Sequence, residues 1–145
     1  MINTTEIRVR GYHLDLYGHV NNARYLEFLE EGRWNFLEEV GELERISQSQ
    51  VGMVVVNINI NYRYAARMNE RLLVHTWMSE LKERSAVMKQ RIVLQDAPET
   101  LVVDADITFV IVDKHSGKSQ RLEGPLRDQL QGWLLEHHPH TLLPC

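Results

Sequence analysis

The spacing of hydrophobic positions divides the chain into a short strand, one long helix and a run of strands. Residues 6–13 alternate loosely between apolar and polar, which predicts a first strand. From Asn22 onward the period lengthens to three or four residues, and acidic residues take the other faces. This pattern predicts one amphipathic helix with a stripe made of Leu26, Leu29, Arg33, Leu37 and Val40.

The predicted helix has suitable residues at both ends. Asn21 or Asn22 is a good N-cap, because an Asn side chain accepts hydrogen bonds from the free N–H groups of a first turn. Gly41 suits the left-handed position that follows the last turn. Gly32, inside the helix, is less favourable than Ala by about 1 kcal/mol. It either permits a close approach of another segment or is simply tolerated.

The rest of the chain predicts strands and a closing helix. Four runs rich in β-branched residues are separated by turn-like stretches, and they cover residues 53–64, 72–81, 85–94 and 101–112. A further short strand is expected at residues 118–122. Pro125 fits the first turn of a final helix, and the apolar stripe expected there is Leu126, Leu130, Trp133 and Leu134.

These elements predict an α+β fold, with an antiparallel sheet of about five strands packed on one long helix. We expect one domain over residues 1–135 and a flexible tail over residues 136–145. A single small sheet leaves an edge and a second face uncovered. We therefore expect a homo-oligomer, either a dimer or a tetramer.

The bulk composition narrows the classes of protein. The chain has 145 residues, a formal net charge of −4 and a single cysteine, Cys145, so it forms no internal disulfide. The negative charge disfavours a partner made of nucleic acid. No basic leader is visible, and no apolar run approaches the roughly 18 residues that span a bilayer. We expect a soluble, cytoplasmic protein that acts away from membranes.

Functional groups are densest in residues 13–25, between the first strand and the long helix. This stretch contains Asp15, two imidazoles, two amides and two phenols. Free N–H groups at a helix N-terminus favour negative charge, so an oxyanion that develops there would be stabilised. Asp15, four residues before His19, would attack a carbonyl or take a proton from water. Alternatively, Asp15 and His19 only brace the loop through hydrogen bonds to its backbone.

Residues 15–25 read Asp-Leu-Tyr-Gly-His-Val-Asn-Asn-Ala-Arg-Tyr. This segment resembles the Asp-x-x-Gly-His-x-Asn-Asn-x-x-Tyr signature of the hydroxybenzoyl-CoA thioesterase branch of hotdog proteins. Residues 10–15, 21–31 and 54–63 further resemble bacterial long-chain acyl-CoA thioesterases, and the similarity extends from about residue 6 to about residue 130. One departure is Ala65, where many relatives have Pro.

The resemblance implies a hotdog fold that cleaves an acyl-CoA thioester without a metal or an organic cofactor. It implies that Asp15 acts on the thioester, that N–H groups at the helix start hold the carbonyl, and that His19 orients the loop or the substrate. Supporting residues that shape the substrate pocket would be Tyr12, Asn21, Asn22, Tyr25 and Arg63. Basic residues that are candidates for the CoA phosphates are Arg63, Arg67, Arg84, Lys89 and Arg91.

Other polar residues favour simpler interpretations. His75 is expected on a strand surface and His115 in a turn, and the histidines of residues 137–140 are expected in the tail. Another hotdog branch has a catalytic Glu on the central helix. Here the three acids Glu27, Glu30 and Glu31 are interpreted as a solvated face.

The leading hypothesis is hydrolysis of fatty acyl-CoA to free acid and CoA. The apolar neighbours Leu14, Leu16, Val20 and Leu26 and the closer resemblance favour fatty acyl groups. The alternatives are hydration or dehydration of an acyl thioester on the same fold, and a protein that binds acyl-CoA without catalysis.

Overall fold

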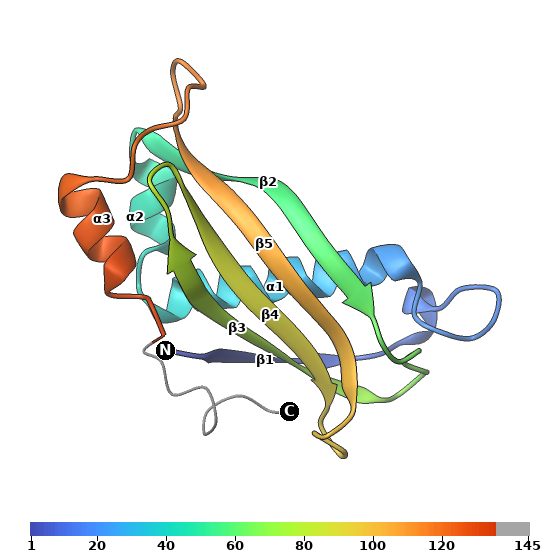
Figure 1. Ribbon diagram of the computed structural model, residues 1–145. Helices are drawn as coiled ribbons and strands as arrows, with labels where there is room; N and C mark the ends of the chain where they lie inside the picture. Colours follow the sequence, from blue (N-terminus) through green and yellow to red (C-terminus); the bar gives the residue numbers. More distant parts are fainter. Residues whose placement is uncertain (136–145) are drawn as a thin grey trace.

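The computed structural model describes residues 1–135 (Figure 1). Its elements are β1 (Asn3–Arg8), the 3-10 helix η1 (Gly11–His13), α1 (Asn22–Glu39), α2 (Leu43–Gln48), β2 (Val51–Tyr62), β3 (Arg71–Leu81), β4 (Ser85–Leu94), β5 (Leu101–Asp113) and α3 (Gly124–Gln131). The five strands form one sheet in the order β1-β3-β4-β5-β2, and every neighbouring pair is antiparallel. The long helix α1 lies across one face of this sheet (Figure 1). The predicted α+β arrangement is confirmed.

Helix α1 packs on the sheet through a stripe of large side chains with a small residue among them. Its buried residues recur three or four positions apart and are Tyr25, Phe28, Leu29, Gly32 and Phe36. A Cβ at Gly32 would lie 2.8 Å from Cγ1 of Val74, so the absence of a side chain allows a close approach to β3. The predicted stripe was partly wrong, since Leu26 is 38% exposed.

Strand β2 is an edge strand with a bulge. It pairs with β5 along one side only, and its register shifts between Val55 and Asn57. Before the bulge, Met53 and Val55 pair with Ile111 and Phe109, which face inward. After the bulge, the residues that pair with inward-facing partners are Ile58, opposite Ile107, and Ile60, opposite Ala105. The extra residue therefore keeps both apolar sets on the face that meets α1. Three consecutive valines, 54–56, are exposed along this edge.

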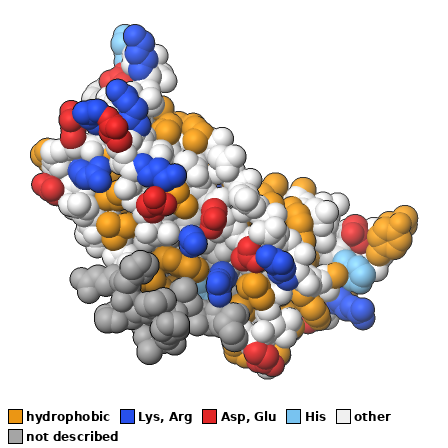
Figure 2. Space-filling view, viewed as in Figure 1, with side chains coloured by type: hydrophobic (Ala, Val, Ile, Leu, Met, Phe, Trp, Pro, Cys, Tyr) orange, Lys and Arg blue, Asp and Glu red, His pale blue; other side chains and the backbone are white. Residues whose placement is uncertain are grey.

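The opposite face of the sheet is charged. Lys89 and Arg91 on β4 are paired across the strands with Asp106 and Asp104 on β5. Figure 2 shows basic and acidic side chains interspersed over this side of the molecule, without a large area of one sign. Two of the basic residues considered for CoA phosphates therefore lie next to acids, on the face away from α1.

Several predicted elements differ from the structure. The first strand ends at Arg8, and residues 11–13 form η1, because the N–H of Arg10 donates to Nδ1 of His13 and the N–H of His13 donates back to the Arg10 carbonyl. Residues 118–122 form no strand; Ser119 makes a single bridge to Val112. Helix α2 was not predicted.

The closing helix is shorter than its predicted apolar stripe. Pro125 lies in its first turn as expected, but the helix ends at Gln131, so Trp133 and Leu134 follow it. Leu134 then forms a bridge beside Met78 of β3. The predicted flexible tail, with its histidines and Cys145, lies outside the described residues.

Candidate active site

The loop between η1 and α1 is a small hairpin closed by its own backbone. Leu14 and Val20 form an antiparallel bridge, the N–H of Asp15 donates to the His19 carbonyl at 2.7 Å, and the N–H of Gly18 donates to the Asp15 carbonyl at 3.1 Å. Gly18 has a φ of +76°, a conformation that favours glycine. The hairpin projects beyond the sheet beside the start of α1 (Figure 1), and Figure 2 shows hydrophobic side chains at its tip.

The carboxylate of Asp15 braces this hairpin with one oxygen. Oδ1 accepts from the N–H of Tyr17 at 2.8 Å and from the N–H of His19 at 3.2 Å. Oδ2 accepts no hydrogen bond from residues 1–135. The bracing role considered from the sequence is thus present, and a second oxygen remains for chemistry.

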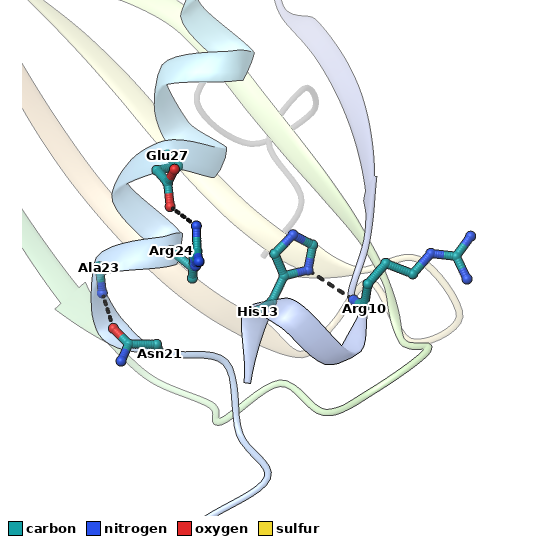
Figure 3. A network of polar contacts seen from close by, with 6 residues as sticks. All are labelled: Arg10, His13, Asn21, Ala23, Arg24 and Glu27. Atoms are coloured by element: carbon teal, nitrogen blue, oxygen red, sulfur yellow. Dashed lines mark hydrogen bonds and ion pairs between the residues drawn. The ribbon is translucent and has the colours of Figure 1, made fainter. Parts of the chain in front are cut away.

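The first turn of α1 contains an unused donor. Oδ1 of Asn21 accepts from the N–H of Ala23 at 2.9 Å, which makes Asn21 the N-cap (Figure 3). The carbonyl of Asn21 accepts from the N–H of Arg24. Among the described residues, the N–H of Asn22 has no acceptor. It is a free donor at the positive end of the helix dipole, where an oxyanion is stabilised.

Tyr25 fixes the start of α1 to the segment that follows β2. Its hydroxyl accepts from the N–H of Ala66 at 3.1 Å and donates to the Tyr64 carbonyl at 3.4 Å, while the Ala66 carbonyl accepts from the N–H of Val20. Burial raises the pKa of Tyr25, and the nearby charge of Asp15 acts in the same direction. Tyr25 therefore stays protonated and holds the hairpin and the helix start together.

Tyr62 is a residue of this region that sequence reasoning did not single out. Its hydroxyl donates to the Asn22 carbonyl at 3.3 Å, and its ring centroid is 5.6 Å from that of Tyr25. The alternation of Ile58, Ile60 and Tyr62 was visible in the sequence and places all three on one face. Their approach to the helix start was not visible, because it joins residues 40 positions apart.

His13 occupies a separate hollow on the β1 side of α1. Nδ1 accepts from the N–H of Arg10 at 2.8 Å (Figure 3), so the neutral ring has its proton on Nε2. Burial, followed by the positive charge of Arg24, lowers the pKa of His13, and Arg24 itself pairs with Glu27 at 2.8 Å. Tyr12, which is 72% exposed, lines this hollow of about 400 Å³.

The remaining predicted site residues are more peripheral. The backbone of His19 bridges to Arg67, and its ring makes no hydrogen bond with residues 1–135. Nε of Arg63 lies 2.8 Å from Oδ2 of Asp104. Burial on its own raises the pKa of Asp104, but hydrogen bonds from Arg63 and Asn61 outweigh it and lower that pKa. Arg63 is therefore already engaged on the face away from α1.

The residues that received simpler interpretations lie where the sequence placed them. Glu27, Glu30 and Glu31 are exposed on α1. His75 is on β3, with Nδ1 3.0 Å from Oγ1 of Thr4, and burial lowers its pKa. His115 is in the turn after β5, where its N–H donates to Asp113.

The inward face of β2 is apolar from the start of α1 onward, since Tyr62, Ile60 and Ile58 follow one another on that face. Farther along β2 lies a cavity of about 290 Å³ whose apolar lining is Trp34, Leu37, Leu43, Ile46, Met53, Val55, Met88, Ile107 and Phe109, with Glu30, Arg33, Ser47 and Lys114 as its polar members. Leu16, expected from the sequence to be an apolar neighbour of the site, is 91% exposed and does not line this cavity.

Within residues 1–135, no three His, Cys, Asp or Glu side chains gather in a way that would hold a metal ion. In the same part of the chain, no helix has the length and apolar character needed to cross a bilayer.

Comparison with known proteins decides the family. Residues 9–134 match the thioesterase-like superfamily. The chain belongs to this superfamily. Among the relatives of this thioesterase-like protein is the long-chain acyl-CoA thioesterase FadM of Escherichia coli K12, 48% identical over 128 residues that cover 88% of the chain and 96% of the relative. The acyl-CoA thioester hydrolase YbgC of Escherichia coli O157:H7 is 31% identical over 83% of the chain and 92% of the relative.

Solved structures agree with the fold of this thioesterase-like protein. The probable thioesterase YbaW of Escherichia coli superposes with a TM-score of 0.83 and 46% identity, covering 92% of this chain and 99% of that one. A probable thioesterase of Bartonella henselae gives a TM-score of 0.68 with 30% identity, covering 84% and 98%. The hotdog fold implied by the resemblance is confirmed.

Proposed function

We propose that this protein hydrolyses fatty acyl-CoA thioesters to a free fatty acid and CoA, with a preference for long chains. The observation that carries this proposal is the placement of Asp15 beside a helix start whose Asn22 N–H is free. The helix start also contacts Tyr62, which belongs to the apolar inward face of β2 that continues through Ile60 and Ile58. The 48% identity to a long-chain acyl-CoA thioesterase over almost the whole chain supports the substrate class.

In the proposed reaction the thioester carbonyl oxygen accepts from the N–H of Asn22. Asp15 then acts through Oδ2 in one of two ways. As a general base it takes a proton from the water that attacks the carbonyl carbon; as a nucleophile it forms a mixed anhydride that water later hydrolyses. In both routes the carbon–sulfur bond breaks and CoA leaves as the thiolate. Both routes need Asp15 ionised, and Oδ1 stays on the hairpin backbone throughout.

The supporting residues have positioning roles in this proposal. Asn21 caps α1 and so orients the free N–H of Asn22. Tyr25 holds the helix start on Ala66, and Tyr62 fixes the Asn22 carbonyl. His19 contributes its backbone to the hairpin and leaves its ring free to meet substrate. Tyr12 remains a candidate for contact with the CoA moiety, whereas Arg63 would first have to leave Asp104.

We further propose that the protein assembles as a homodimer or a larger homo-oligomer through β2. Within residues 1–135, the outer edge of β2 has no strand partner and presents the exposed valines 54–56, a combination that favours pairing with another strand. A second copy on this edge would extend the sheet and would lie near Tyr62, which contacts the start of α1. The site would then be close to a subunit boundary.

The test is CoA release from acyl-CoA substrates of increasing length, from acetyl-CoA to stearoyl-CoA. We expect kcat/KM to rise toward lauroyl-, myristoyl- and palmitoyl-CoA. Faster turnover of acetyl-CoA than of palmitoyl-CoA would contradict the chain-length preference. Interconversion of enoyl- and 3-hydroxyacyl-CoA without release of CoA would instead establish the hydratase alternative, and tight binding without turnover would establish the binding protein.

A further inference from the structure

The cavity beside the C-terminal half of α1 is bounded on one side by the short helix α2. Leu43, Ile46 and Ser47 of α2 form one of its walls, and the core residues Met88, Ile107 and Phe109 of β4 and β5 are at its base. None of the residues of α2 is buried, and its N-cap residue Glu42 makes no side-chain capping bond. A six-residue helix with so few attachments is marginal on its own and depends on what holds it in place.

Lys114 is the residue that holds α2 in place. Its Nζ donates to the Ile46 carbonyl at 3.2 Å and to the Ser47 carbonyl at 2.9 Å, at the C-terminal end of α2. Its backbone N–H donates to the Gln50 carbonyl at 2.8 Å. A cation at the negative end of a helix is the favourable arrangement. Lys114 therefore connects α2 to the end of β5.

The two cations that line the cavity are already engaged, and its remaining charged residue, Glu30, is an anion, which favours an apolar occupant over an anionic one. The ammonium of Lys114 is used by the two α2 carbonyls. The guanidinium of Arg33 donates to Oε1 of the buried Gln90 at 3.0 Å. The remaining wall is built mainly from apolar side chains. A hydrocarbon chain fits such a lining better than an anionic ligand does.

The distance of the cavity from the helix start matches a long acyl chain. Counted along α1 at about 1.5 Å per residue, Glu30 lies roughly 12 Å and Leu37 roughly 22 Å from Asn22. Carbon–carbon bonds of about 1.5 Å advance an extended chain by roughly 1.25 Å per carbon, so sixteen carbons span about 19 Å. If the chain extends along α1, an octanoyl chain held at Asn22 would end before the cavity, whereas a palmitoyl chain would reach into it.

We propose that the cavity receives the terminal methylene groups of the acyl chain, and that α2, held by Lys114, is the end wall that sets the accepted chain length. This inference rests on the proposed acyl-CoA hydrolysis and adds the residues that determine its specificity. Ile46 and Lys114 are then specificity-determining residues, remote from the reacting atoms. Because an octanoyl chain does not reach the cavity, kcat/KM for octanoyl-CoA depends on the catalytic residues alone. The value of kcat/KM for longer substrates depends in addition on the end wall.

The kinetic test compares octanoyl-, palmitoyl- and stearoyl-CoA. Ile46→Phe fills the cavity, so kcat/KM for palmitoyl-CoA should fall by at least about 10-fold, because each methylene kept out of an apolar site forfeits roughly fourfold in affinity. The value for octanoyl-CoA should change by less than about twofold. Lys114→Met keeps the aliphatic part of the side chain but removes the two hydrogen bonds to α2. The end wall should then yield to longer chains, so the ratio of kcat/KM for stearoyl-CoA to kcat/KM for palmitoyl-CoA should rise.

Leu126→Phe on α3 is the matched control, since it adds the same ring outside the cavity. Equal losses on octanoyl- and palmitoyl-CoA in Ile46→Phe, or an unchanged profile in both variants, would overturn the inference. Wild-type protein that releases no CoA from any of these substrates would instead overturn the proposed function.

A binding test locates the chain without turnover. Trp34 lines the cavity and is 48% exposed, so a bromine atom that enters the cavity should quench its fluorescence. The probe is palmitoyl-CoA brominated at its last carbon, added to Asp15→Asn protein, with palmitoyl-CoA brominated at carbon 5 as the reference. We expect strong quenching only from the terminal bromine, and its loss in an additional Trp34→Phe variant. Bound probe that quenches equally from both positions would overturn the inference.

Discussion

Nε2 of Gln90 donates to the carbonyl of Leu29 at 2.8 Å, which connects the middle of α1 to the strand beneath it. The same nitrogen donates to Oγ1 of Thr76 at 2.8 Å, and Oε1 accepts from Arg33. Gly32 makes this approach possible, because a Cβ there would lie 3.0 Å from Nε2 of Gln90. A fully bonded amide in an otherwise apolar core fixes where α1 lies on the sheet.

Replacing this amide should destabilise the fold. Gln90→Met keeps the length of the side chain but leaves the half-buried guanidinium of Arg33 and the hydroxyl of Thr76 without their partner. Leaving such groups unpaired costs about 1–3 kcal/mol in the free energy of unfolding. Urea unfolding followed by circular dichroism measures the loss. Lys89→Met, on the exposed face of the same strand, should be close to neutral, and equal stability of the two variants would contradict the network's role.

Asp15→Asn should lower kcat for palmitoyl-CoA by about 10²–10⁴, the usual worth of general-base assistance. Oδ1 of Asn accepts the same two N–H groups as Oδ1 of Asp15, so the hairpin and the melting temperature should be retained. Asp15→Ala removes the brace as well and should lower both activity and stability. An Asn variant that keeps more than about a third of wild-type kcat defeats the assignment, because that loss is worth under 1 kcal/mol of barrier.

Tyr25→Phe should loosen the start of α1. The change leaves the buried N–H of Ala66 without an acceptor, at a cost of about 1–3 kcal/mol. We expect a lower free energy of unfolding and faster hydrogen exchange at the Ala66 amide. Tyr17→Phe is the control, since the Tyr17 side chain is exposed. An unchanged exchange rate at Ala66 would show that the hydroxyl does not hold this segment.

Stability should fall on mild acidification. Burial lowers the pKa of His13 and of His75 below the ordinary value of 6.5. The unfolded chain therefore takes up these protons first, and the stability they contribute is complete above about pH 6.5 and is lost as the pH falls through the lower folded-state pKa values. Melting temperatures between about pH 7.5 and pH 5 should show this decline.

His13→Asn tests the origin of that decline. An Asn side chain offers an acceptor to the N–H of Arg10 but does not titrate. Its melting temperature should vary less with pH over the same range, and a double variant with His75→Asn should vary less again. If the melting temperatures of wild type and variants vary identically with pH, titratable groups other than these two histidines cause the loss of stability.

Charging the edge of β2 should separate the proposed subunits. Val54→Lys combined with Val56→Lys places like charges along a strand edge that would face its own copy, which opposes pairing. Light scattering should report the monomer mass for this variant and a multiple of it for wild type. Thr108→Lys, on the neighbouring strand β5, should keep the wild-type mass. A monomeric, fully active wild-type protein would contradict the assembly.

The spacing of hydrophobic positions was enough to predict the long helix and the long strands. All four long strands start and end within two residues of their predicted bounds, because antiparallel strands rich in β-branched residues combine local preference with clear turns. Helix α2 escaped detection since six residues are too few to show a helical period. The sequence alternation predicted a strand through residue 13, but the ring of His13 accepts a hydrogen bond from the N–H of Arg10, and this local contact stabilises a turn there instead.

The candidate site was only partly visible in the sequence. Asp15, Asn21 and Asn22 stood out because one short segment contains them all. Tyr62 and Lys114 did not, because their contacts reach 40 and 67 positions along the chain. A motif reveals residues that act within one loop, whereas the lining of the cavity comes from distant strands and helices that only the fold brings together.

The bulge in β2 determines where this strand can lose a residue without changing its inner face. With simple alternation, a strand that turns Met53 and Val55 inward would turn Ile58 and Ile60 outward. The single extra residue reverses that parity, so one face of the strand stays apolar across its whole length. Deleting Val56 would remove this extra residue, and simple alternation would then keep both apolar sets on the inner face. A one-residue deletion elsewhere in β2 would instead turn one half of the strand over, so the bulge is the position where this strand should best tolerate the loss of a residue.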